Sequence, residues 1–322
     1  MNPITTTQPD AEPTAPACRV GIRAMGCLFE IMIWDADAEW SRAVALEALA
    51  EIERLDRQLS HYRGDSDIAR LNALATTEWV RVEPELFGLL QTCARWTEET
   101  DGAFDIATGA LLECWGFHRG SGRLADEAAL SCALAASGMR RVELDAQDCL
   151  VHFSAPELIL NLGAVGKGYA LDRAADVLRF YGVRSALLHG GQSTILAVGG
   201  PPDAEAWRFQ IKDPRDRANI LATAHLRDAA LSTSGSYEQY VEVNGMKYSH
   251  ILDPRTGRPV TERLLVTART AGAAWSDALS TALFVMGHER ATDFVERHPE
   301  VAFVMLSEDV RGGTVISRAG LP

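Results

Sequence analysis

Apolar residues recur at helical spacing in several segments of this chain. The longest such segment is Ala38–Ser60, where one side of the predicted helix collects six apolar residues three or four positions apart. These residues are Ala43, Leu46, Leu49, Ile52, Leu55 and Leu59. Further helices are predicted over Glu83–Thr100, Ile106–Trp115, Asp126–Ser137, Lys167–Tyr181, Trp275–Met286 and Glu289–Arg297.

Predicted strands are concentrated in the second half of the chain. Near the start, the alternating segment Cys18–Trp34 is interpreted as one strand, and Arg141–Phe153 as a hairpin around a polar turn. An apolar run at Leu158–Leu162 is predicted to form the strand before a glycine-rich turn. Later strands are predicted over Ser185–His189, Thr194–Val198, Trp207–Lys212, Asn219–Ala224, Ala229–Ser232, Gln239–Val243 and Leu264–Arg269, with a closing hairpin of Val301–Leu306 and Gly313–Ser317.

This order of elements indicates an α+β protein rather than regular β-α-β winding. We expect a single composite domain over residues 18–322, with antiparallel or mixed sheets and flanking helices. Residues 1–17 contain four Pro, several Thr and no Lys or Arg, which predicts a disordered tail.

Composition and charge exclude several classes of protein. The 322 residues include 31 Lys and Arg against 44 Asp and Glu, a net charge of −13, which disfavours general binding to nucleic acid or anionic membranes. No stretch approaches the roughly 20 apolar residues of a membrane span. The six cysteines lack C-x-x-C spacing, so neither a zinc site nor a disulfide framework is indicated. The N-terminus lacks the basic and apolar regions of a signal peptide, and we therefore expect a cytoplasmic protein.

The segment Asn161–Tyr169, NLGAVGKGY, places three glycines ahead of a predicted helix. Glycine lets the backbone approach a ligand closely, and a helix N-terminus offers amide donors to a phosphate, beside the charge of Lys167. The spacing matches neither the dinucleotide-binding nor the P-loop pattern. A tight strand-to-helix turn and a phosphate site are both compatible with it.

Asp277 and Thr281 lie one turn apart on a predicted helix. A carboxylate and a hydroxyl on one helix face are hard oxygen ligands suited to Mg²⁺. Alternatively, Asp277 is an acidic residue near a helix start that the helix dipole favours, and Thr281 has no special role.

Three other polar clusters carry candidate chemistry. His250 precedes the turn Asp-Pro-Arg-Thr-Gly and could act as an acid or base. Thr100–Asp105 predicts a turn with Asp105 near a helix cap. Tyr62, in a polar loop, could stack on a planar ring or cover an edge of the core.

Taken together and in order, these clusters resemble the ApbE family of FAD:protein FMN transferases. The matching pieces run from Met25 to Gly287 and share the family's motif order. They are Met25-Gly26, Ser60–Tyr62 with Asp65-Ser66 and Leu71-Asn72, Thr100–Asp105, Asn161–Asp172, Gly190-Gly191, Thr233–Gly235, His250–Pro259 and Ser276–Thr281.

The resemblance implies an ApbE-like, T-fold-like enzyme that binds FAD and Mg²⁺. Such an enzyme moves the FMN half of FAD onto a Ser or Thr hydroxyl of an acceptor flavoprotein and releases AMP. It implies metal ligands at Asp277, Thr281 and the backbone carbonyl of Ala164. Implied FAD contacts are Met25, Tyr62, Ala103, Phe104, Asp105, Asn161, Lys167 and Ile251.

We add His250 as the hypothetical general base for the acceptor hydroxyl, with Asp277 as the alternative proton acceptor. Asn161 stands where family members often carry Asp, so this position can form hydrogen bonds but supplies no charge. Two other functions are compatible with the same residues. One is an FAD pyrophosphate hydrolase that uses water as nucleophile, and the other is a non-catalytic flavin-binding assembly factor.

Overall fold

The computed structural model describes residues 4–6, 15–117, 124–236, 240–243, 246–308 and 313–321. It divides the chain into two compact units, each built from separate stretches of sequence. The first unit comprises Met1–Asp56, Val165–Gly235 and Glu262–Pro322, and the second comprises Arg57–Ala164 and Ser236–Thr261. The sequence predicts one composite domain because no linker marks these boundaries. One boundary even falls within a helix, α1 (Ala38–Leu59).

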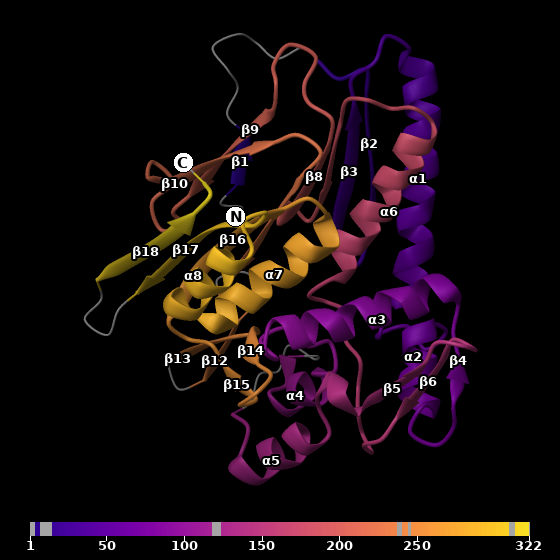
Figure 1. The fold of residues 1–322 in the computed structure, drawn as a ribbon, viewed down its shortest axis with the longest axis vertical. Coiled ribbons are helices and arrows are strands. Elements are labelled where there is room, and N and C mark those ends of the chain that lie inside the picture. The colour runs from indigo at the N-terminus through magenta and orange to yellow at the C-terminus, as the bar shows by residue number, and fades with distance from the viewer. Residues whose placement is uncertain are drawn as a thin grey trace. The chain divides into compact units, whose positions relative to one another are not determined.

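An eight-stranded sheet is the centre of the first unit, and all of its recorded strand pairs are antiparallel (Figure 1). In spatial order its strands are β18 (Thr314–Ala319), β17 (Ala302–Glu308), β16 (Arg263–Thr270), β11 (Ala230–Gly235), β8 (Thr194–Val198), β7 (Ala186–Gly190), β3 (Cys27–Ile33) and β2 (Cys18–Ala24). A smaller sheet in the same unit consists of β1 (Ile4–Thr6), β9 (Trp207–Lys212) and β10 (Ile220–Leu226).

Two helices of the first unit pack on this sheet and on each other. Helix α6 (Gly166–Phe180) contacts β7 and β8, and α7 (Ala273–Met286) contacts β8, β11 and β16. Helix α8 (His288–Arg297) follows α7 and packs on β17 and β18. Eleven of the fourteen residues of α7 are buried, which explains why its sequence is apolar on nearly every side.

The second unit contains short helices and three small sheets. Its helices are α2 (Asp67–Leu74), α3 (Pro84–Glu99), α4 (Gly109–Cys114), α5 (Glu127–Ala135) and the 3-10 helix Met139–Arg141. Its strands are β4 (Val80–Arg81), β5 (Val142–Asp145), β6 (Leu150–Phe153), β12 (Tyr240–Val243), β13 (Met246–Ser249), β14 (Leu252–Asp253) and β15 (Arg258–Pro259). The indole of Trp115 donates a hydrogen bond of 2.8 Å to the carbonyl of Gly257, which ties the turn before β15 to the cluster around Leu111 and Leu130.

Most predicted elements are confirmed, with boundaries within a few residues. Residues 38–59, 84–99, 109–114, 127–135, 166–180, 273–286 and 288–297 are helical, and the strands of the two predicted hairpins pair antiparallel. Residue 239 of one predicted strand lies outside the described residues. The α+β class with a large antiparallel sheet is confirmed.

Three expectations differ from the structure. Cys18–Trp34 is a hairpin rather than one strand, because Met25 and Gly26 form a two-residue turn between β2 and β3. Leu158–Leu162 lies outside any sheet, and its backbone bonds instead to the side chain of Asn72, to Ile106 and to Gly109 at the start of α4. Helix α2 was not predicted, although Ser66 caps it by accepting a hydrogen bond from the amide of Ala69.

Part of the segment predicted to be a disordered tail takes part in a sheet. Residues 4–6, within the segment predicted to be disordered, pair with β9, and residues 1–3 and 7–14 lie outside the described residues.

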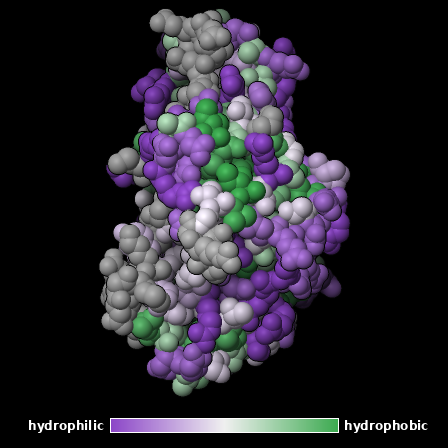
Figure 2. Space-filling view, turned by 90° about the vertical axis from the view of Figure 1, so that its left-hand side faces the viewer, coloured by the Kyte–Doolittle hydropathy of each residue, from purple (hydrophilic) through white to green (hydrophobic). Residues whose placement is uncertain are grey.

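On the face in Figure 2, hydrophobic residues gather in a central patch bordered by hydrophilic ones. Within the described part of the chain, no helix has the length and apolar character needed to cross a membrane.

Candidate functional site

The N-terminus of α6 lies unusually close to the N-terminus of α7, and Gly168 makes this possible. A Cβ atom on Gly168 would lie 2.1 Å from the carbonyl oxygen of Ala273 and 2.8 Å from the Cα of Ala274. No side chain fits in that space, so the second glycine of the G-K-G segment is required for helix packing. Gly168 therefore serves the packing of α6 on α7, and the phosphate site that the sequence also allows stays a prediction.

Asp277 is the charged centre of this contact. It is 5% exposed, and its Oδ2 accepts a hydrogen bond of 3.2 Å from the backbone amide of Gly168. The ammonium of Lys167 lies 3.5 Å from the same oxygen, while the hydroxyl of Thr194 donates to Oδ1 at 3.2 Å. The structure thus brings the predicted residues Lys167 and Asp277 together. It also shows that both carboxylate oxygens have protein partners.

Asp172 forms the matching contact in the opposite direction. Its carboxylate, on α6, accepts hydrogen bonds of 2.7 and 2.8 Å from the amides of Ala273 and Ala274 in the first turn of α7. Burial raises the pKa of the Asp172 carboxyl above its ordinary value, and the two backbone amides partly offset that rise. Each helix therefore supplies a carboxylate to amide groups at the start of the other.

Thr281 lies one turn after Asp277 and belongs to a chain of hydroxyl groups. Its Oγ1 lies 3.2 Å from the Oγ of Ser234, on β11, and 3.5 Å from the carbonyl oxygen of Asp277. The Oγ of Ser234 also lies 2.8 Å from the Oγ of Ser280, whose hydroxyl donates to the Asp277 carbonyl at 2.9 Å. Thr281 is only partly buried, whereas Ser280 is fully buried.

Met25 is held in a strained turn close to the start of α6. Met25 and Gly26 both have positive φ, 49° and 74°, as the two-residue hairpin turn requires. The amide of Met25 donates a hydrogen bond of 2.7 Å to Asp56, which stabilises a conformation unfavourable for a residue with a Cβ. The Met25 sulfur would lie 4.0 Å from a Cβ on Gly166, so this predicted FAD contact is near Lys167 along the first turn of α6.

The other predicted residues belong to the second unit, and their exposure differs. The Tyr62 ring is 72% exposed and lies against His61, with ring centroids 3.8 Å apart, so it is available for stacking. Ala103 and Phe104 are each 1% exposed, so any ligand contact there would involve the backbone.

Asp105 has a structural role in the second unit. Its carboxylate accepts hydrogen bonds from the amides of Ala107 at 2.7 Å and Met139 at 2.9 Å. Thr108, three residues later, is the residue before α4, so Asp105 lies near that helix start, as predicted, without capping it. Burial raises the pKa of Asp105, and the two amides partly offset that rise.

The glycine-rich segment ends the second unit with an ordered turn. Oδ1 of Asn161 accepts a hydrogen bond of 2.8 Å from the amide of Gly163, so the amide side chain shapes the turn without a charge. Ala164 directly precedes Val165, which occupies the N-cap position of α6 but makes no side-chain hydrogen bond to that helix start.

Two further predicted residues follow β13. His250 is partly buried. Ile251 is buried, and its carbonyl accepts a hydrogen bond from the amide of Val260.

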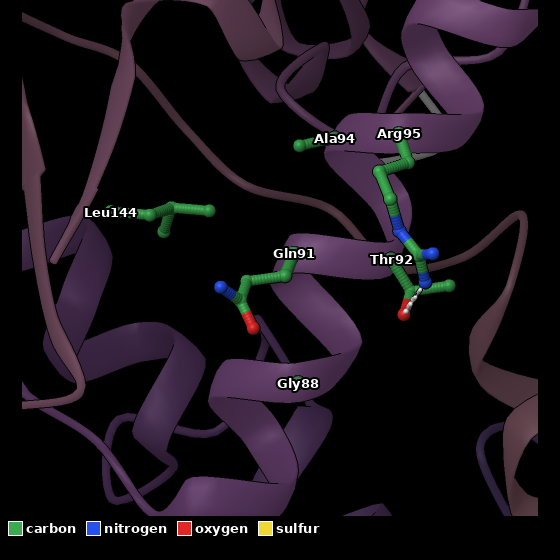
Figure 3. A pocket seen from close by; sticks show the side chains of 6 residues that line it. All are labelled: Gly88, Gln91, Thr92, Ala94, Arg95 and Leu144. Atoms are coloured by element: carbon green, nitrogen blue, oxygen red, sulfur yellow. Dashed lines mark hydrogen bonds between the residues drawn. The ribbon is translucent and has the colours of Figure 1, made fainter. Parts of the chain in front are cut away.

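A separate surface pocket of about 520 Å³ lies in the second unit (Figure 3). It is lined by Gly88, Gln91, Thr92, Ala94 and Arg95 of α3 and by Leu144 of β5. Figure 3 shows the Arg95 guanidinium bonded to Thr92, at 3.2 Å, rather than directed across the pocket. None of the predicted site residues lines it, and it contains no acidic or nucleophilic cluster.

Sequence reasoning missed four residues that contact the predicted metal ligands or fix their helix. Thr194 has no motif signal, because it is an ordinary threonine at the start of an apolar strand. Ser234 and Ser280 do belong to the quoted motif segments, yet nothing in a linear sequence indicates that their hydroxyls meet. Asp172 also belongs to such a segment. Its position as an acidic residue at the end of the G-K-G-Y-A-L-D run is the one sequence feature that could have drawn attention to it.

Comparison with known proteins gives a consistent result. The ApbE family model matches residues 25–305. The FAD:protein FMN transferase of Klebsiella pneumoniae (strain 342) is 29% identical over 304 residues, covering 92% of this chain and 87% of that protein. The enzyme of the same name from Treponema pallidum (strain Nichols) is 32% identical over 284 residues, covering 82% and 77%.

Solved structures agree with these sequence relatives. The ApbE protein of Thermotoga maritima superposes with a TM-score of 0.85 at 30% identity, covering 94% of this chain and 97% of that one. The apo form of the Pseudomonas stutzeri flavinyl transferase ApbE gives a TM-score of 0.83 at 30% identity, covering 94% of both chains.

Proposed function

This chain belongs to the ApbE family, and from that premise we propose that it is an FAD:protein FMN transferase. It moves the FMN moiety of FAD onto a Thr or Ser hydroxyl of an acceptor flavoprotein and releases AMP. In this reaction the acceptor oxygen forms a bond to the phosphorus of the FMN half. The bond from that phosphorus to the bridging oxygen breaks, and AMP leaves with that oxygen.

The observation that carries the proposal is the group around Asp277 in the first unit. A buried carboxylate, an ammonium 3.5 Å away and the amide-rich start of α6 are gathered at one point. Lys167 and the helix start offer positive charge to a pyrophosphate. The carboxylate offers a ligand to a divalent cation, so both halves of a phosphate-and-metal site are supplied by neighbouring residues.

Magnesium fits the oxygen donors available. Asp277, Thr281 and the carbonyl of Ala164 would hold it, and when bound it would neutralise charge on the pyrophosphate. Among the described residues, no three His, Cys, Asp or Glu side chains cluster as a metal-binding group. A site with one carboxylate suits Mg²⁺, which normally keeps several waters or phosphate oxygens among its ligands.

The residues of this chain have distinct roles in the proposal. Lys167 binds and orients the phosphates, and the exposed ring of Tyr62 stacks on a planar ring of the flavin nucleotide. His250 takes the proton of the acceptor hydroxyl, and Asp277 is the alternative acceptor of that proton.

Intact-mass measurement tests the proposal directly. The protein is incubated with FAD, Mg²⁺ and a candidate acceptor domain, alongside the same acceptor with its target Thr or Ser replaced by Ala. We expect the acceptor to gain one FMN and AMP to appear in equal amount, with no gain on the Ala control and none with EDTA. Free FMN and AMP without labelled acceptor would indicate a hydrolase, and retained FAD without turnover would indicate a flavin-binding protein.

A further inference from the structure

The hydroxyl groups of Ser280, Ser234 and Thr281 form a chain whose proton direction can be derived. A hydroxyl has one proton to donate and two lone pairs that accept. Ser280 donates its proton to the carbonyl oxygen of Asp277, which can only accept, at 2.9 Å. The Oγ of Ser280 can therefore only accept from Ser234, 2.8 Å away.

The same reasoning extends to the end of the chain. Because Ser234 uses its proton on Ser280, its oxygen can only accept from Thr281, 3.2 Å away. The other partner of Thr281 is the carbonyl of Asp277, at 3.5 Å, and this group also only accepts. Both neighbours thus draw the Thr281 proton toward the sheet and its own helix, and the lone pairs are left for a ligand.

We propose that Ser234 is a positioning residue that orients the Thr281 hydroxyl as a ligand for a divalent cation, with Ser280 fixing the proton direction. The inference rests on the proposed function, because it assumes that Thr281 holds the cation. A cation needs a lone pair and is repelled by a hydroxyl proton directed at it. The chain also polarises the Thr281 oxygen, since consecutive hydrogen bonds strengthen one another.

The position of Ser234 in the sheet makes it suited to this role. Ser234 belongs to β11, the central strand on which α7 packs, and its backbone pairs with Val266. Ser280 is fully buried and α7 is buried on most of its surface, so the Ser280 hydroxyl is confined to these partners, while Ser234 is partly buried.

The test compares Ser234→Ala with Ser234→Thr and Ser276→Ala. Ser276 is the control, because it is a buried serine of α7, the helix that carries Thr281. Its hydroxyl donates to the backbone carbonyl of Ala268 at 2.8 Å and takes no part in the hydroxyl chain. The readouts are Mn²⁺ binding to the protein alone, followed by the EPR signal of free Mn²⁺, and the Mg²⁺ concentration for half-maximal FMN transfer. Thermal unfolding verifies that each variant is folded.

We expect Ser234→Ala to weaken Mn²⁺ binding and raise the half-maximal Mg²⁺ concentration by roughly 3- to 10-fold, the effect of one hydrogen bond. Ser234→Thr keeps a hydroxyl and should restore binding to within about twofold. Ser276→Ala should lower thermal stability but leave both metal readouts at wild-type values. If Ser234→Ala binds Mn²⁺ and responds to Mg²⁺ like wild type, the inference is overturned while the transferase proposal stands. If wild type itself neither binds Mn²⁺ nor requires Mg²⁺, the metal part of the proposed function fails, and the inference fails with it.

Discussion

Replacing Gly168 with alanine should separate the two helices that form the candidate site. The new Cβ would lie 2.1 Å from the carbonyl oxygen of Ala273, whereas real Cβ contacts essentially never fall below 3.0 Å. The helices must therefore move apart by about 0.9 Å at this point, because neither backbone can yield locally. Such a movement lengthens the 3.2 Å hydrogen bond from Gly168 to Asp277 beyond useful range.

The magnitude follows from these two losses. Overpacking of a rigid interior costs about 1–3 kcal/mol, and a lost hydrogen bond to a buried carboxylate costs about 1–3 kcal/mol more. We therefore expect Gly168→Ala to lower the free energy of unfolding by about 2–6 kcal/mol, measured from urea unfolding curves. FMN transfer should fall with it, since Asp277 loses its alignment with Lys167.

A control in the same kind of structure predicts the opposite sign. Gly88 also lies within a helix, α3, but a Cβ there meets nothing within 4 Å. Gly88→Ala should therefore raise stability by about 0.5–1 kcal/mol, because alanine favours the helix. A Gly168→Ala variant that unfolds at the wild-type midpoint and keeps its activity would refute the close approach of α6 and α7.

Two further predictions concern charge. Asp277→Asn keeps the shape but removes the charge next to Lys167, so FMN transfer should drop by at least about 100-fold. Thr194→Val removes only one neutral hydrogen bond and should cost about 10-fold or less, and equal losses for the two variants in a steady-state assay would contradict the role of the charge. Burial lowers the pKa of His189 below its ordinary value of 6.5, so the unfolded chain takes up this proton first as the pH falls. Stability should therefore decline below about pH 6.5. In urea titrations from about pH 8 to 5, His189→Gln should make this decline smaller, while His288, whose pKa burial also lowers, still contributes to it. An unchanged pH dependence would contradict this assignment.

The elements were predictable where one periodicity dominates a segment. Helix α1 shows apolar residues on one face, and β9 alternates buried with less buried residues, so each pattern reports its structure directly. Cys18–Trp34 misled for a physical reason, because the Met25-Gly26 turn leaves the apolar content high and only shifts the alternation by one position. The more buried residues have even numbers before the turn and odd numbers after it. Only the left-handed backbone of both residues reveals the turn, and that conformation has no strong signal when the first of them is methionine.

The candidate site was predictable where its residues are neighbours on one helix, but not where they come from different elements. Asp277 and Thr281 are one turn apart in sequence, so their spacing alone places them together. Thr194 and Ser234 reach the same point through pairings within the sheet, which depend on strand order rather than on local pattern. No residue spacing encodes such contacts, and only the fold shows them.

The reciprocal contacts between α6 and α7 have a consequence for folding. Gly168 meets Asp277 across 109 positions of sequence, and Asp172 meets the start of α7 across just over 100. Contacts between such distant residues form late, because the intervening chain must first be ordered. During synthesis, α6 emerges long before α7. The amide of Gly168 in the first turn of α6 therefore lacks its hydrogen-bond partner, the Asp277 carboxylate, until most of the chain has been made. We therefore expect the ability to bind a divalent cation at this point to appear only at the end of folding, as a marker of the completed first unit.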